Sequence, residues 1–323
     1  MWRDSAQLGS AHVPPKEHVE VPVTAIIPAH CRLAPLLNTL DVVIRCDPPP
    51  AEILVHVDGA NEEIVAALAR KFPQVKVLKS DELLGPGGSR NRLIAAAHHE
   101  LVANFDDDSF PTHRDYFAKV LEVAEMLPDS AIYSAEVMTH LPKSQEQNPD
   151  ALFWRVVMFS GCGCVFRKSW FLKTTGFVPI PISYSMEETD LSLQLYAMGG
   201  VMVQTALLRV CHINPREGTP NALITSYSIA NIFLMGFLRY PPILWPLVPL
   251  QALSKMLWLA RRRWYGGIGN GLRLSVAHLA KYASYRKPMS VWKVLSWLVA
   301  RRRPERQIAA KQSMSATSCA AIL

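Results

Sequence analysis

The sequence lacks several features that would assign it to particular classes of protein. Cysteine is scarce, at six in 323 residues, and no cysteines have the spacing of a secreted disulfide framework or a zinc site. The first 20 residues are polar and contain no apolar run of the kind found in a signal peptide. Charged residues make up 19% of the chain and hydrophobic residues 50%, which excludes disorder throughout. We therefore expect a folded protein of the cytoplasm.

Acidic residues are almost missing from the last part of the chain. From Gln251 onward the sequence has 14 Lys or Arg residues and one acid, Glu305. Residues 218–254 carry a single charge, Arg239, and prolines break their second half, which predicts a pair of buried or interfacial helices. Residues 289–303 combine Trp and Leu with basic side chains, a pattern typical of a helix lying on an anionic membrane. This composition favours a membrane surface over nucleic acid as the partner.

The first half of the chain alternates between two hydrophobic patterns. Short β-branched runs predict strands, and runs with helical spacing lie between them. The alternation predicts an α/β fold with a mostly parallel sheet. The expected strands are 21–28, 52–57, 75–78, 101–105, 131–137, 163–166 and 207–211, and the expected helices are 33–45, 61–72, 90–99, 114–127, 169–175 and 188–198. The polar stretch 141–150 is expected to form a loop.

Three adjacent aspartates, Asp106, Asp107 and Asp108, follow a predicted buried strand. Adjacent carboxylates repel one another unless a cation or solvent neutralises them. In an extended segment, Asp106 and Asp108 point the same way and can share one ion. Their hard oxygen ligands favour Mg²⁺ or Mn²⁺, which can bridge the phosphates of a nucleotide. The alternative is an acidic turn on the surface.

Three further segments contain candidate functional residues. Glu187, Glu188 and Asp190 stand at the start of a predicted helix, where they can supply a general base or simply complement the helix dipole. The glycine-rich segment 85–91 can approach a phosphate closely, although it fits no standard nucleotide motif. His212 follows a predicted strand and can serve as a metal ligand or as a structural histidine.

In chain order, these segments resemble the motifs of the family 2 glycosyltransferases, which have the GT-A fold, over about residues 21–241. The matching motifs are Pro28-Ala29-His30, Asp58-Gly59, the glycine-rich turn ending in Arg90-Asn91, Asp106-Asp107-Asp108 and Glu187-Glu188-Thr189-Asp190-Leu191. The resemblance implies a UDP-, dTDP- or GDP-sugar donor bound by Pro28, Ala29, His30, Asp58, Gly88, Arg90, Asn91, Asp106 and Asp107. It also implies a divalent cation, Mn²⁺ or Mg²⁺, held by Asp106, Asp108 and His212.

The resemblance further implies a mechanism, with two departures from the family pattern. Glu188 stands where the family's catalytic base is usually an aspartate, so we expect Glu188 to be the base, with Asp190 and Glu187 in reserve. Gly59 stands where a second acid is common. The Q-x-x-R-W signature of processive synthases is absent, which implies transfer of a single sugar, with inversion, to a glycan, lipid-linked or small-molecule acceptor.

The expected organisation has four parts. These are a polar extension over 1–20, a catalytic domain over 21–217, an apolar and basic helical region over 218–303 and a flexible tail over 304–323. The basic region predicts a peripheral position on the inner face of the cell membrane. Two alternatives remain open: a sugar nucleotidyltransferase, although Pro28 and its neighbours replace that class's glycine-rich loop, and an inactive membrane-bound binding protein on the same fold.

Overall fold

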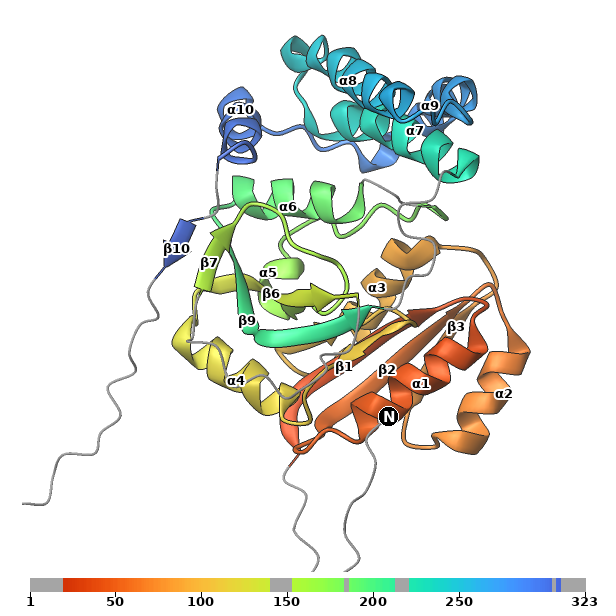
Figure 1. Cartoon of the computed structure of the whole chain (residues 1–323), viewed down its shortest axis with the longest axis vertical. Helices are drawn as coiled ribbons and strands as arrows, with labels where there is room; N and C mark the ends of the chain where they lie inside the picture. Colours follow the sequence, from red (N-terminus) through yellow and green to blue (C-terminus); the bar gives the residue numbers. More distant parts are fainter. Residues whose placement is uncertain (1–19, 140–152, 183–185, 213–220, 304–305, 309–323) are drawn as a thin grey trace, which may run out of the picture.

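The structure is a computed structural model that describes residues 20–139, 153–182, 186–212, 221–303 and 306–308. The predicted loop at 141–150 lies outside the described residues, as do the N-terminal extension up to residue 19 and nearly all of the predicted tail. Within the described part, a ten-stranded sheet is covered by helices on both faces, and a layer of C-terminal helices lies beyond α6 (Figure 1). The predicted α/β class is confirmed.

One half of the sheet is parallel, in the order β3-β2-β1-β4. Three helices make the crossovers that parallel neighbours require. The strands are β1 (Val21–Ala29), β2 (Pro50–Asp58), β3 (Lys76–Ser80) and β4 (Leu101–Asn104), and the helices are α1 (Leu33–Ile44), α2 (Glu62–Lys71) and α3 (Gly85–Ala96). Because the carboxyl ends of parallel strands meet at one edge, Asp58 and the aspartates after β4 lie at the same edge of the sheet.

The other half of the sheet is mixed, which differs from the mostly parallel sheet that we predicted. The strand β8 (Val165–Arg167) inserts antiparallel between β4 and β6, β9 runs parallel to β6, and β5, β7 and β10 pair antiparallel. Antiparallel neighbours need no helical crossover, so the strand-helix alternation of the first half does not continue here. The remaining strands are β5 (Ser109–Pro111), β6 (Ser130–Met138), β7 (Phe153–Val156), β9 (Val201–His212) and β10 (Arg306–Ile308).

Two hydrophobic layers cover the sheet. Alternate residues of β1, such as Ala25 and Ile27, face the layer formed with α1, α2 and α4 (Tyr116–Met126), while Ile26 faces the opposite layer. That second layer contains α3, the short helix α5 (Lys168–Phe171) and α6 (Glu187–Ala197). A strand buried on both faces reads as a continuous apolar run, as β1 does in the sequence.

The C-terminal helices form a further core with α6. They are α7 (Ala222–Arg239), α8 (Leu247–Arg261), α9 (Ile268–Lys281) and α10 (Val291–Ala300), with a 3-10 turn η1 (Pro242–Leu244) before α8. Leu193 of α6 shares this core with Leu234 of α7 and Trp297 of α10. The region is therefore packed onto the α/β domain through α6.

Two helical segments within the described residues, Ala222–Arg239 and Pro242–Arg261, have the length and apolar composition of a membrane span. The first has 61% of its window buried in the protein, so α7 is a core helix, whereas the second has only 22% buried. The helix predicted to lie on a membrane over 289–303 buries Val294 and Trp297 on one face, and the Trp297 indole donates to the Val157 carbonyl at 3.1 Å. Only the side of α10 opposite Val294 and Trp297 remains exposed.

Candidate functional site

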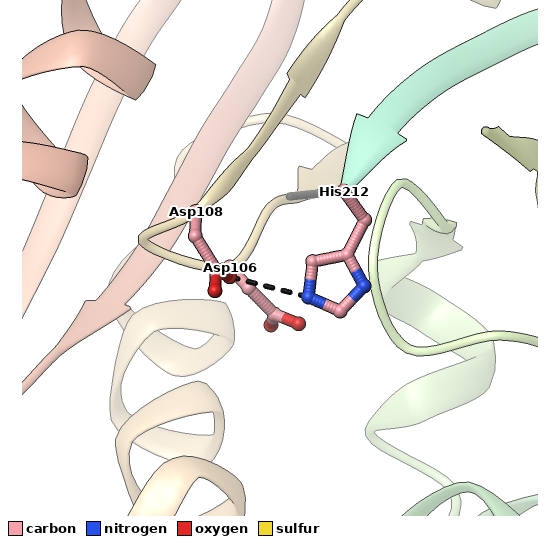
Figure 2. Close-up of side chains that lie close together, drawn as sticks. All are labelled: Asp106, Asp108 and His212. Atoms are coloured by element: carbon pink, nitrogen blue, oxygen red, sulfur yellow. Dashed lines mark ion pairs between the residues drawn. The ribbon is translucent and has the colours of Figure 1, made fainter. Parts of the chain in front are cut away.

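Three predicted metal ligands come together at the edge of the sheet. The carboxylates of Asp106 and Asp108 and the imidazole of His212 each place a ligand atom within 4.8 Å of the others (Figure 2). The pairing of Ser109 with His212, the last residue of β9, brings the two segments side by side. Asp106 and Asp108 lie on a tight turn, in which the Asp106 amide donates to the Ser109 hydroxyl at 2.7 Å, rather than on the extended segment that we predicted.

The charges of this cluster fit a divalent cation. One oxygen of Asp108, Oδ1, is buried without a hydrogen-bond partner among the described residues, although it lies 3.2 Å from His212 Nε2 as an ion pair. The contact with Asp108, followed by that with Cys162, raises the pKa of His212 to about 11, so the imidazole must lose its proton when it binds a metal. Two carboxylates, one of which has an oxygen without a hydrogen-bond partner, and an imidazole form a ligand set suited to Mg²⁺ or Mn²⁺.

The sequence reading missed Arg32, which holds the other side of the aspartate run. Its Nε donates to Asp107 Oδ2 at 3.0 Å, its Nη1 lies 2.5 Å from Asp108 Oδ2, and its Nη2 pairs with Asp107 Oδ1. Burial raises the pKa of Asp107 to about 6, and the Arg32 guanidinium opposes that rise. Arg32 comes three residues after the end of β1. This position at the carboxyl edge of the sheet is the sequence signal from which a role in the site could have been predicted.

Arg90 connects the metal cluster to the acidic helix. This buried guanidinium donates to Asp106 Oδ1 at 2.6 Å, to Glu187 Oε2 at 2.5 Å and to Asn104 Oδ1 at 3.2 Å. All three nitrogens of its fork are thus engaged by protein oxygens. Arg90 thus fixes the relative positions of Asp106 and Glu187, and its predicted contact with the donor stays a prediction.

The three predicted acids at the start of α6 have different environments. Glu187 pairs with Arg90, and Asp190 accepts from Arg239 Nε at 2.5 Å and Nη2 at 2.8 Å and from Gln194 at 3.0 Å. Glu188 has no such cation partner among the described residues, and a Cβ at Gly161 would lie 2.4 Å from its Oε1. Burial, followed by the negative charge of Glu187, raises the pKa of Glu188 to about 7. A carboxyl that titrates near neutrality is suited to proton transfer.

Asp58 caps the glycine-rich turn. Its Oδ1 accepts from the Leu84 amide at 2.9 Å and from the Ser80 hydroxyl at 3.1 Å, and its Oδ2 accepts from the Gly85 amide at 2.9 Å. His30 lies beside it, with Nδ1 2.8 Å from the Asp58 carbonyl oxygen. Asp58 therefore has a structural role in this geometry, and its predicted contact with the donor base stays a prediction.

The other predicted donor-binding residues also make internal contacts. Pro28 and Ala29 are the last residues of β1 and pair with β2. A Cβ at Gly88 would lie 2.6 Å from Leu84 Cβ, so the glycine there allows close packing. Asn91 and Phe177 exchange two hydrogen bonds, of 2.8 and 2.9 Å, which tie α3 to the segment before α6. These contacts explain the residue types in the glycine-rich motif without a ligand.

Comparison with known proteins places the fold in one class. Residues 24–174 match the family model described as Glycosyl transferase family 2. The structure is similar to the mannosyltransferase PcManGT from Pyrobaculum calidifontis in complex with GDP-Man and Mn²⁺, with a TM-score of 0.53 and 18% identity over 87% of this chain and 86% of that one. No curated protein sequence matches the chain significantly.

A second solved structure supports the same fold. GalNAc-T7 with UDP, GalNAc and Mn²⁺ gives a TM-score of 0.52 and 15% identity over 69% of this chain and 49% of that one. At such identities these similarities establish a shared GT-A fold and no more. Together with the family match, they define the class as glycosyltransferases. Residues 24–174, just under half of the chain, thus form a domain that matches glycosyl transferase family 2.

Proposed function

We propose that the chain transfers a single sugar from a nucleotide-sugar donor to an acceptor hydroxyl, with inversion and with a divalent cation bound. The observation that carries this proposal is the link that Arg90 makes between two features, through its ion pairs with Asp106 and with Glu187, the neighbour of Glu188. On one side is the cluster of Asp106, Asp108 and His212, and on the other is Glu188, whose pKa burial raises to about 7. The donors proposed are UDP-, dTDP- or GDP-sugars, because the two similar structures hold GDP-Man or UDP.

The cation proposed is Mn²⁺ or Mg²⁺, held by Asp106, Asp108 and His212, where it would neutralise the charge of the leaving diphosphate. The chain's own contribution to the chemistry centres on Glu188. Its carboxylate takes the proton of the acceptor hydroxyl as the oxygen attacks the anomeric carbon. Arg90 holds Asp106 and Glu187 and so fixes the metal cluster relative to the base. A single displacement with one base inverts the anomeric centre.

The proposal extends to organisation and location. Residues 21–217 form the catalytic domain, and residues 218–303 hold it against the inner face of the cell membrane, where glycan, lipid-linked or small-molecule acceptors are available. The absence of Asp and Glu between residues 218 and 304 supports an anionic surface as the partner of this region.

A donor screen tests the proposal. Purified protein is incubated with UDP-, GDP- and dTDP-sugars, with Mn²⁺ or EDTA, and with lipid extract or simple sugars as acceptor, and released nucleotide is measured. We expect metal-dependent release from one donor, lost in Asp108→Ala and in Glu188→Gln. A donor that binds in calorimetry while no nucleotide is released under any condition would instead support an inactive binding protein.

A further inference from the structure

The helix α8 has two apolar faces, of which only one is covered. Val248 and Ala252 are buried, and Val248 packs so closely on α7 that a Cβ at Gly236 would lie 2.2 Å from its Cγ2. On the opposite face, Leu250, Leu253 and Leu257 are 59%, 47% and 51% exposed. Their spacing of three and four residues aligns them in one stripe along the helix. A surface helix of a soluble domain is normally polar on that side.

Neighbouring residues enlarge this stripe. Ile243 and Trp245, just before α8, are 76% and 41% exposed, and Trp258 is 39% exposed. We define the outer α8 surface as Ile243, Trp245, Leu250, Leu253, Leu257 and Trp258. In Figure 1 α8 lies at the end of the molecule farthest from the sheet, so the α/β domain does not cover this surface. Exposed apolar side chains gathered along one helix and the turn before it in this way mark an interaction site.

The charges around the stripe indicate which kind of partner this surface fits. Two cations stack on Trp258: Lys255 Nζ lies 4.4 Å and Arg262 Cζ 4.2 Å from the ring centroid. Arg261 stands four residues after Leu257 and continues the stripe, and it is exposed, as Arg263 is. Trp, Leu and Arg in this arrangement match the boundary of a bilayer, where apolar side chains enter the acyl region and cations stay with anionic headgroups.

We propose that the outer α8 surface lies on the anionic membrane, with α8 parallel to it and its leucines inserted at headgroup depth. This surface deepens the membrane association proposed above and replaces the predicted helix at 289–303, whose core-facing side is buried. A second copy of this chain fits less well, since its own cations would face those around Trp258. If α8 crossed the membrane instead, Val248 would have to lose its close packing on Gly236.

Vesicle sedimentation tests this surface. The variants are Leu253→Glu/Leu257→Glu and, as a matched control, Trp292→Glu on α10, which removes an apolar side chain that is 80% exposed outside the outer α8 surface. The vesicles are pure phosphatidylcholine or contain a third of phosphatidylglycerol. We expect wild type and Trp292→Glu to bind the anionic vesicles equally. The double variant should bind them at least about tenfold more weakly, because two inserted leucines are lost. Its melting temperature and its donor hydrolysis in solution should be unchanged.

Each other outcome overturns a specific statement. If the double variant binds as wild type does and Trp292→Glu does not, α10 is the docking helix and the proposed surface is wrong. If wild type binds no vesicle, the membrane association itself fails, and the donor screen still decides glycosyl transfer. If wild type forms dimers that the double variant does not form, a second copy covers the outer α8 surface.

Discussion

The two acidic segments of the site differ in how their carboxylates are arranged. After β4, Asp106 and Asp108 converge on His212, so several ligands share one position. At the start of α6 the acids diverge: Glu187 turns to Arg90 and Asp190 to Arg239, each into its own ion pair. A converging set is suited to hold a cation, and a diverging set leaves one carboxylate available for proton transfer. At the start of α6 the arginine partners distinguish the two supporting acids from Glu188, whereas after β4 Arg90 and Arg32 contact the proposed metal ligands Asp106 and Asp108 themselves.

The largest effect is expected at Glu188. In Glu188→Gln the amide cannot accept the proton, so the rate of transfer should fall by about a hundred- to ten-thousand-fold. The fold should persist, because Glu188 has no cation partner among the described residues. Nucleotide release and a urea melt, measured on the same sample, check both parts. A variant that keeps most of its activity would remove Glu188 from the mechanism.

The opposite pattern is expected at Asp190. Asp190→Asn leaves the fully buried Arg239 without its counter-charge, which should lower the free energy of unfolding by about 3–5 kcal/mol. Asp190→Leu/Arg239→Met removes both charges and should recover most of that loss. Urea melts compare the three proteins. If Asp190→Asn stays as stable as wild type and loses transfer, Asp190 is the base and the contrast drawn between these neighbours is wrong.

A smaller effect is expected at Arg32, which shares Asp108 with the metal site. Arg32→Gln removes a competing cation, so Mn²⁺ should bind about tenfold more tightly in the absence of donor, a change of about 1.4 kcal/mol. Calorimetry with Mn²⁺ alone measures this, with Arg70→Gln on α2 as the control for lost charge. Weaker Mn²⁺ binding in Arg32→Gln would show that Arg32 shapes the site instead of competing for it.

The dependence on pH follows from the raised pKa of Glu188. As a base, Glu188 must be deprotonated, so kcat/KM should level off above about pH 7 and fall tenfold per unit below it. Stability has the opposite sign: a carboxyl with a raised folded-state pKa contributes stability that is present below its unfolded pKa near 4.5 and is lost as the pH rises through about 7. Glu188→Gln should therefore gain stability over wild type at pH 8 and equal it at pH 4.

Local patterns predicted the parallel half of the fold well. Strand β1 and helix α1 appear within a residue or so of their predicted bounds. The pattern of apolar residues close together in the sequence is enough to indicate a strand buried on both faces or a helix with one buried face. Helix α3 begins at Gly85, five residues before its predicted start at Arg90. Its first turn is stabilised by Asp58, 27 residues earlier in the chain, which accepts a hydrogen bond from the Gly85 amide. Local helix propensity cannot predict a contact between residues so far apart in the sequence.

The metal ligands were predicted from motif order, and the structure brings them together. The arginines that support the site were harder to foresee. Arg32 meets Asp107 across 75 residues, and Arg239 meets Asp190 across 49, so only the folded sheet and the α6–α7 packing reveal them. The mixed half of the sheet was missed for the same reason, since the place of β8 depends on long-range pairing.

The anomeric configuration of the product tests the central claim most directly. Once the donor is known, the glycoside formed by wild type is examined by NMR. The one-bond coupling between its anomeric carbon and proton is compared with that of the donor. One displacement assisted by Glu188 predicts a product of opposite configuration. A product that retains the donor's configuration would contradict a single inverting step and would leave Glu188 without the role proposed for it.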